Sequence, residues 1–188
     1  WRQPFDEIHF PDGVHVTVER IHRQERMIAN YEGRIMKDEV SSSFIILNSS
    51  FFSDLVAAHH LQQACFGREA WGYLDLISMF LTPGLVRLKA VMGDRLIGFV
   101  IGDPNHWERV GWIATICVHP DYRKRGIGRA LLGKCEETLR ESKIKLTVRA
   151  SNTTAISLYR KLGYKQIGIW QRYYTGGEDG VVMEKSRS

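Results

Sequence analysis

The amino-acid sequence predicts an α/β fold in which helices flank one mixed, mostly antiparallel sheet. From about residue 44 onward, segments with strand-like and helix-like patterns alternate densely along the chain. Near the middle, a short apolar run rich in β-branched residues leads into a basic, glycine-containing turn and then into an amphipathic helix. These two observations indicate one domain with a ligand site where a strand meets a helix.

The length of the chain fits one such domain with an extension. The 188 residues, of which 44% are hydrophobic, can bury one substantial core and are too few for two domains of ordinary size. We place the boundary at the serine run 41–43, so that residues 1–43 form an N-terminal extension and residues 44–188 form the domain. Within the extension, two apolar triplets flank Pro11-Asp12-Gly13 and predict a β-hairpin.

Two helices are expected to open the domain. Ser53 is the predicted N-cap of the first helix, which runs to about Cys65. The second helix is expected to end at the breaker sequence Thr82-Pro83-Gly84. Its predicted buried stripe consists of apolar residues at helical spacing, namely Trp71, Leu74, Ile77 and Leu81.

Strands follow these helices. Residues 85–92 and 95–101 flank the turn pair Gly93-Asp94 and are expected to form an antiparallel hairpin. Residues 110–118 are predicted to be the next strand, because the segment is rich in β-branched residues and ends at His119-Pro120-Asp121.

The last quarter of the chain predicts a strand, a helix and a hairpin. Residues 145–149 form the expected strand, and residues 152–162 form the helix, which Gly163 ends. Residues 165–170 and 181–183 are expected to pair as the final hairpin.

The turn at residues 123–129 carries the strongest functional signal. Its sequence, Arg-Lys-Arg-Gly-Ile-Gly-Arg, combines basic side chains with glycines at which the backbone can approach a ligand. Consecutive amides at the start of the following helix can bind an anion, and the helix dipole adds to that attraction. We therefore predict a phosphate-binding turn, although a basic surface turn without a ligand is the alternative.

Two other nucleotide motifs do not fit this turn. A dinucleotide fingerprint needs a small residue where Leu131 stands and an acidic residue about 20 positions later, and the chain has neither. A Walker A loop nearly matches residues 128–135, but Cys135 replaces the magnesium-binding hydroxyl. Leu131 and Leu132 also belong to the apolar stripe of the helix, not to an open loop.

The remaining pattern, Arg-x-x-Gly-x-Gly after a strand, resembles motif A of the GNAT acyltransferase superfamily, whose members bind the pyrophosphate of acetyl-CoA in this turn. The order of elements over residues 44–185 resembles the GNAT fold, which implies two central parallel strands that splay apart. The pantetheine arm is then expected between residues 113–118 and 145–150. The resemblance implies acetyl-CoA as donor, no metal, and these cofactor-binding residues: Ile116, Cys117, Val118, Arg123, Lys124, Arg125, Gly126, Ile127, Gly128, Arg129, Asn152 and Tyr159.

Residues 148–164 closely resemble the ribosomal-protein N-terminal alanine acetyltransferases, the RimI-like branch. In those relatives, the asparagine at the position of Asn152 contacts the cofactor, and the tyrosine at the position of Tyr159 protonates the departing CoA sulfur. Without the family, Tyr159 is equally open to a core role, because Ile156 and Leu162 share its helical face.

The general base is less clear. RimI-like enzymes carry a glutamate where this chain has Thr147, and related enzymes place a glutamate or tyrosine at the position of Trp112. Glu108 is the catalytic candidate that remains, with His106 nearby, although both can be ordinary loop residues. A weak base favours an α-amine, with a pKa near 7.7–8.0, over a lysine near 10.4. We expect direct attack by the α-amine of a protein or peptide.

The segment 172–180 resembles the hairpin that borders the acceptor groove in N-terminal acetyltransferases. Tyr173 and Tyr174 are the expected substrate-binding residues, and a glycine-rich turn with surface aromatics is the alternative. Two other functions stay open. The chain can be a small-molecule amine acetyltransferase in which Glu178 and Asp179 anchor the acceptor, or a catalytically weak CoA-binding sensor.

Charge and cysteine content restrict the partners. The net charge of +5 favours anionic partners, and CoA is sufficient to explain it, so no nucleic acid is expected. The three cysteines are odd in number and lie among apolar residues, which argues against disulfides and a metal site. No run approaches the roughly 18 apolar residues of a membrane span. We expect a cytoplasmic protein and leave a homodimer and the acyl preference open.

Overall fold

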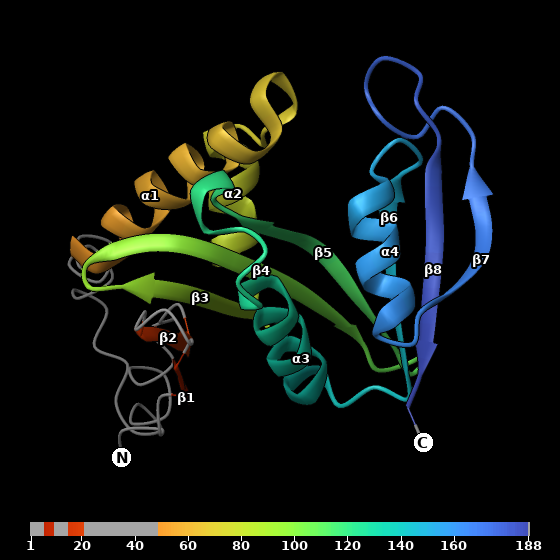
Figure 1. Ribbon diagram of the computed structural model, residues 1–188, viewed down its shortest axis with the longest axis horizontal. Helices are drawn as coiled ribbons and strands as arrows, with labels where there is room; N and C mark the ends of the chain where they lie inside the picture. The colour runs from red at the N-terminus through yellow and green to blue at the C-terminus, as the bar shows by residue number, and fades with distance from the viewer. Residues whose placement is uncertain (1–5, 10–14, 21–48, 188) are drawn as a thin grey trace, which may run out of the picture.

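The computed structural model describes residues 6–9, 15–20 and 49–187. This part of the chain forms one eight-stranded sheet with the strand order β1-β2-β3-β4-β5-β6-β8-β7 (Figure 1). Among the described strands, β5 and β6 are parallel, and every other neighbouring pair is antiparallel. The predicted α/β fold with a mixed, mostly antiparallel sheet is therefore confirmed.

The elements have the following bounds. The strands are β1 Asp6–His9, β2 His15–Arg20, β3 Val86–Met92, β4 Arg95–Asn105, β5 Val110–Val118, β6 Lys143–Arg149, β7 Lys165–Trp170 and β8 Gly180–Ser186. The helices are α1 Ser49–Phe66, α2 Tyr73–Leu81, α3 Ile127–Leu139 and α4 Thr153–Lys161, with single 3-10 turns at Gly67–Glu69 and Pro120–Tyr122.

Most elements lie where the sequence places them. The two predicted hairpins are β3–β4 and β7–β8, and β5 has the predicted bounds. Asn152 caps α4, since its Oδ1 accepts a hydrogen bond from the Ala155 amide at 3.1 Å. Gly163 follows this helix with φ +93°, the left-handed conformation expected of a glycine that ends a helix.

Helix α1 begins before its predicted cap. It starts at Ser49, so Ser53 lies one turn inside the helix instead of at its end. The residues before Ser53 are serines and phenylalanines, and each costs only a few tenths of a kcal/mol in a helix relative to better helix formers. The helix can therefore extend through them, and the capping preference of Ser53 does not set its start.

The buried face of α2 also differs from the predicted stripe. Leu76 and Phe80 are buried at 0% and 4% exposure, whereas Leu74 and Leu81 of the predicted stripe are 82% and 53% exposed. Nearly every residue of α2 is apolar, so the periodicity is compatible with more than one face. Packing against α1 and the sheet selects the face that is buried.

Part of the N-terminal segment joins the sheet. β1 and β2 pair as an antiparallel hairpin, as predicted, and β2 then pairs with β3 through positions such as Thr17 and Val91. The turn Pro11-Asp12-Gly13 lies outside the described residues. The division of the chain at residues 43 and 44 stays a prediction.

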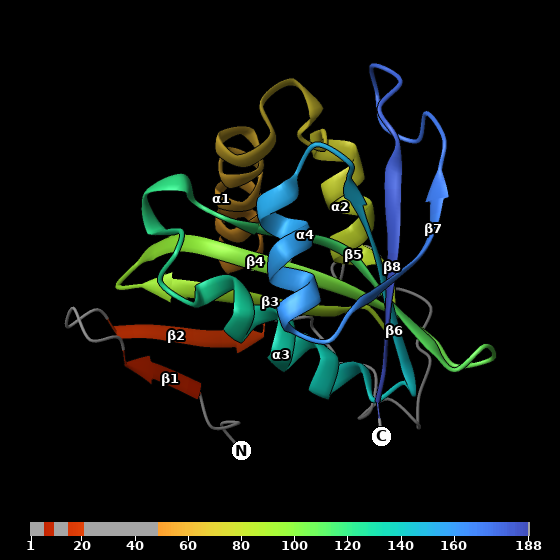
Figure 2. The same cartoon turned by 45° about the vertical axis from the view of Figure 1, so that its right-hand side comes forward.

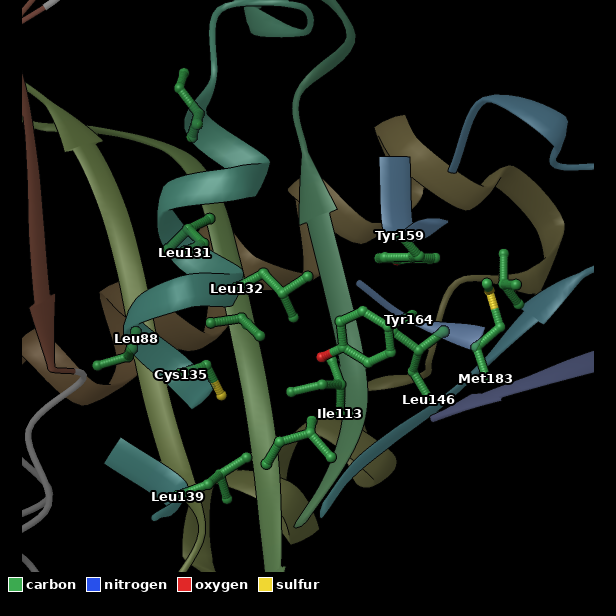
Figure 3. Close-up of a cluster of buried hydrophobic side chains, with 14 of the residues drawn as sticks. Leu88, Ile113, Leu131, Leu132, Cys135, Leu139, Leu146, Tyr159, Tyr164 and Met183 are labelled. Atoms are coloured by element: carbon green, nitrogen blue, oxygen red, sulfur yellow. The ribbon is translucent and has the colours of Figure 1, made fainter. Parts of the chain in front are cut away.

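The helices cover both faces of the sheet (Figure 2). α1 and α2 pack on one face against Phe99 and Ile101 of β4. α3 and α4 pack on the other face, where Leu131, Leu132 and Leu139 of α3 are buried (Figure 3). None of the helices in the described ranges is long and apolar enough to cross a membrane.

Helix α3 links the two halves of the sheet through a buried carboxylate. Glu136 accepts a hydrogen bond from the Tyr164 hydroxyl at 2.8 Å and contacts Lys185 Nζ at 2.6 Å. Tyr164 and Lys185 belong to the β6–β8–β7 half, whereas the apolar face of α3 packs on β3, β4 and β5. Burial and the neighbouring Glu136 raise the pKa of Tyr164, so its hydroxyl stays a donor.

The close approach of α3 to the sheet predicts a strong effect of Gly102→Ala. A Cβ at this position would lie 2.7 Å from Cys135 Sγ and 3.0 Å from Leu139 Cδ1. We expect the variant to lose about 1–3 kcal/mol of unfolding free energy in urea titrations, because the helix must move to make room. Gly133→Ala, inside α3 with nothing within 4 Å, is the control and is expected to stabilise. Equal stability of both variants contradicts this account of the packing.

Candidate active site

The site begins where β5 and β6 part. The two strands pair at four positions, from Val110 with Lys143 to Ile113 with Leu146. Beyond these positions β5 continues its pairing with β4, and β6 continues with β8. Figure 1 shows the strands side by side near the C-terminus of the chain and far apart at their other ends. The predicted splay of two parallel strands is thus present and leaves a wedge.

The backbone of β5 presents polar groups along one side of this wedge. The His119 amide donates to the Ile97 carbonyl at 2.9 Å, so the backbone groups of His119 point toward β4. Because direction alternates along a strand, those of Cys117 also point toward β4, and those of Ile116 and Val118 point into the wedge. The Cys117 side chain is buried against α1 and α2, and its expected contact with the cofactor stays a prediction.

The basic turn after β5 has the conformation that a phosphate cradle needs. Gly126 has φ +86°, a left-handed conformation that costs other residues about 1–2 kcal/mol. The first backbone bond of α3 runs from the Ala130 amide to the Gly126 carbonyl. The amides of Ile127, Gly128 and Arg129 therefore have no acceptor within the helix and form the positive end of its dipole. The Ile127 side chain itself is buried in the core.

The basic side chains of the turn differ in their surroundings. Arg123 Nε donates to the Val118 carbonyl at 3.1 Å, which holds the turn against the end of β5. The Arg125 guanidinium lies 5.6 Å from the centre of the Tyr122 ring. Arg129 and Lys124 are exposed, and Lys124 has φ +63°. The turn is therefore partly built by its own arginines, and it keeps exposed cations next to the free amides.

Tyr159 lies on the other side of the wedge. Its side chain is 8% exposed and belongs to the core cluster with Leu146 and Ile113 (Figure 3). Among the described residues its hydroxyl makes no hydrogen bond, whereas the neighbouring Tyr164 is bound to Glu136. Burial, with a smaller effect of Tyr174, raises the pKa of Tyr159 to about 12. Tyr159 is thus a protonated donor without an acceptor.

Glu108 lies at the wrong end of the strands for the catalytic role considered above. It belongs to the β4–β5 turn, two residues before the closed end of the wedge at Val110. At about 3.3 Å per strand residue, it is more than 20 Å along the chain from Ile116. His106 lies in the same turn and contacts Glu141 at 2.6 Å. This placement does not support a role of Glu108 as the general base, and the assignment stays an untested prediction.

A charged network that the sequence did not indicate lies at the open end of the wedge. Arg149, at the end of β6, forms ion pairs with Glu69 and with Glu178, the latter at 2.6 Å. Glu69 belongs to the α1–α2 connection, so Arg149 joins that connection to the β7–β8 loop. The Ser151 hydroxyl and amide, followed by Arg149, lower the pKa of Glu178 to about 2. Residues this far apart in sequence leave no local pattern to detect.

A row of aromatic side chains runs from this network to Trp112, in the paired part of β5. Tyr174 donates its hydroxyl to the Thr147 carbonyl at 3.1 Å and stacks under the Arg149 guanidinium at 4.2 Å. Tyr173 is 53% exposed and lies 5.0 Å from the Tyr174 ring centre. Trp170 lies 5.0 Å from Tyr173 and 5.6 Å from Trp112. Trp112, Trp170, Tyr173 and Tyr174, the aromatic wall, form a row from β5 to the β7–β8 loop.

Cys65 is a further ionisable group near the end of β5. Its Sγ lies 3.3 Å from the Val118 carbonyl oxygen, which also accepts the hydrogen bond from Arg123. A hydrogen bond with Cys117, aided by Arg123 and opposed by burial, lowers the pKa of Cys65 to about 7. Burial raises the pKa of Cys117, and it raises that of Cys135 to about 12.

Comparison with known proteins agrees with this geometry. Residues 55–164 match the family model described as acetyltransferase (GNAT) family. The ribosomal protein bS18 alanine N-acetyltransferase of Escherichia coli K12 is 42% identical over 137 residues, which cover 70% of this chain and 90% of that protein. Matches to relatives from Mycobacterium leprae, Sulfurisphaera tokodaii and Arabidopsis thaliana span only 21%, 46% and 59% of those proteins.

Solved structures give the same result. The crystal structure of the ribosomal-protein-S18-alanine N-acetyltransferase from Escherichia coli has a TM-score of 0.65 and 30% identity, over 72% of this chain and 89% of that one. Nourseothricin acetyltransferase has a TM-score of 0.52 and 30% identity, over 55% of this chain and 66% of that one.

The lowered pKa predicts that Cys65 is the most reactive thiol of the folded protein. Its alkylation by iodoacetamide, followed by mass spectrometry, should rise with pH and reach half of its maximal rate near pH 7, because the thiolate forms above that pKa. Cys117 and Cys135 should stay unmodified. In Arg123→Gln the midpoint should shift upward, since a cation that favours the thiolate is lost. A wild-type midpoint at or above pH 8.5 contradicts the assignment.

Proposed function

Since the chain belongs to the GNAT family of acetyltransferases, we propose that it transfers the acetyl group of acetyl-CoA to the α-amine of a protein or peptide N-terminus. The observation that carries this proposal is the buried hydroxyl of Tyr159, for which the described residues provide no hydrogen bond, on the α4 side of the wedge. The similarity to the bS18 alanine N-acetyltransferase supports the class of acceptor.

The residues of the wedge fit the chemistry of CoA. The free amides at residues 127–129 and the exposed Lys124 and Arg129 match a pyrophosphate in charge and in hydrogen bonding. The backbone groups of Ile116 and the amide of Val118 match the amides of a pantetheine arm, because both sides then complete a strand-like ladder. The Val118 carbonyl is already an acceptor for Arg123 and Cys65. Acetyl-CoA bound in this way supplies an acetyl thioester at the open end of the wedge.

Tyr159 has the properties of the acid for the leaving thiolate. Its hydroxyl holds a proton up to a pH near 12 and has no competing acceptor among the described residues. In a buried site a phenol can donate this proton to the CoA sulfur as the carbon–sulfur bond breaks. Asn152 is occupied as a helix cap through Oδ1, and we propose that its side-chain amide nitrogen donates to the cofactor.

The acceptor is expected to enter between the α1–α2 connection and the aromatic wall. Tyr173 and Trp170 are exposed there, and Leu74 on α2 contributes apolar surface. The Arg149 ion pairs hold both borders in place. An α-amine loses its proton at neutral pH for less than about 1 kcal/mol, so attack does not require a strong base at this position.

A small amine is the second candidate acceptor. The similarity to nourseothricin acetyltransferase at 30% identity favours it. Glu178 and Asp179, considered as its anchors, are already engaged, because Glu178 binds Arg149 and Asp179 Oδ1 accepts from the Arg172 amide at 2.8 Å. A peptide acceptor would contact aromatic rings and backbone groups. It would not need Glu178 or Asp179 to leave their present partners.

The role of Tyr159 predicts the kinetics of Tyr159→Phe. We expect kcat for a peptide with a free N-terminus to fall about 10²-fold or more, with little change in KM for acetyl-CoA, because the proton donor is lost and the cradle remains. Release of free thiol and mass spectrometry of the peptide measure the reaction.

Tyr164→Phe is the matched control for this variant. It should lower stability, because Glu136 loses a hydrogen bond, and leave kcat near that of the wild type. Full activity of Tyr159→Phe would remove the assigned acid. Tight CoA binding by calorimetry without turnover of any peptide or small amine would instead favour a CoA-binding sensor, and absence of CoA binding would overturn the proposal.

A further inference from the structure

A basic hollow lies at the closed end of the wedge, away from the acetyl-transfer site. It has a volume of about 920 Å³ and lies between the β4–β5 turn, the C-terminal end of α3 with the following loop, and the end of the chain. Figures 1 and 2 show that the β4–β5 turn reaches out at the end of the molecule where the C-terminus lies. Its lining residues are His106, Arg109, Lys134, Glu137, Thr138, Leu139, Arg140, Glu141, Ser142 and Arg187.

Cations are in excess in this lining. Four cationic side chains face two carboxylates. Glu141 is paired with His106 at 2.6 Å, and Glu137 lies 3.6 Å from Lys134. Arg109 and Arg140 are exposed, and neither guanidinium forms an ion pair with a carboxylate of the described residues. The hollow is therefore electropositive and suited to an acidic ligand.

Two of these arginines occupy backbone positions that favour glycine. Arg109 has φ +55°, and Arg140, the residue that ends α3, has φ +60°. A side chain at such positions is unfavourable, and glycine is the usual residue after a helix. Backbone strain of this kind raises the question of what the two side chains contribute. A cation at a helix C-terminus is stabilised by the helix dipole, which can account for Arg140 at the end of α3. That effect does not account for Arg109, which lies in a turn.

An exposed tryptophan borders the hollow. Trp107 is 98% exposed and sits between the lining residues His106 and Arg109. Large aromatic side chains are rarely left in solvent without a partner, and tryptophan and arginine are the residues that dominate binding at protein interfaces. Glu108 and Glu137 lie among the cations and would repel the closely spaced phosphates of a nucleic acid. A peptide that carries both acidic and apolar side chains fits this surface better.

From these observations we propose that the hollow is a docking site for an acidic segment of a protein partner, in which carboxylates bind Arg109 and Arg140 and an apolar side chain packs on Trp107. The site is separate from the acetyl-transfer wedge. The β4–β5 turn is held by the α3–β6 loop, since the Arg109 carbonyl accepts from the Lys143 amide at 3.3 Å and from the Ser142 hydroxyl at 3.2 Å. The docking surface is thus preformed.

The test uses a fluorescein-labelled, N-acetylated peptide of alternating Asp, Glu and Leu, whose blocked amine is not an acceptor. Fluorescence anisotropy at physiological salt should show binding, and the double variant Arg109→Gly with Arg140→Gly should weaken it about tenfold or more. The same variant should have an equal or higher Tm, because glycine relieves the backbone strain. Its acetylation of a short peptide should be unchanged.

Arg172→Gly is the matched control. Arg172 also has a positive φ, +52°, but lies in the β7–β8 loop, so this variant removes a similar charge and strain elsewhere and should keep peptide binding. Trp107→Ala should weaken binding without lowering Tm. Unchanged peptide affinity in the double variant would overturn the proposal. So would tighter binding of a short poly-uridine RNA than of the peptide, which would identify a nucleic-acid surface.

Discussion

The separation of β5 from β6 after four paired positions is the constraint on which the rest of the structure depends. It leaves the backbone groups of Ile116 and the amide of Val118 without a strand partner in the middle of the sheet, whereas the Val118 carbonyl accepts from Arg123. Such groups are costly when buried without hydrogen bonds, so the wedge must be filled by water or by a ligand with matching amides. A gap of this kind would weaken the fold if the sheet alone held it together.

Helix α3 holds the two halves of the sheet together across the gap. Its apolar face packs on β3, β4 and β5, and its buried Glu136 binds Tyr164 and Lys185 on the other half of the sheet. The same helix presents its N-terminal amides after Gly126, whose left-handed conformation directs the chain into the helix. One element thus supplies the link across the wedge and also presents the unpaired amides at its N-terminus.

The two ends of the wedge have different chemistry. At the open end, Arg149 joins the α1–α2 connection to the β7–β8 loop, and Tyr174 of the aromatic wall packs on the Arg149 guanidinium. At the closed end, the strands are paired, and the surface carries arginines in strained conformations with an exposed tryptophan. Among the described residues, the non-glycine positions with positive φ are all arginine or lysine, and Lys124 among them lies in the basic turn before α3. Strain is therefore concentrated at basic surface positions.

The sequence by itself determined the features that depend on neighbouring residues. The hairpin turns, the bounds of β5, the Asn152 cap and the basic turn before α3 follow from local propensity and from the conformation that glycine permits. The tertiary structure decided which apolar face of α2 is buried, which way the backbone of Cys117 points, and that Glu108 is remote from Tyr159. It also brought together Glu69, Arg149 and Glu178. These outcomes depend on pairing and packing between segments that are distant in sequence. No short stretch of sequence determines the energy of those contacts.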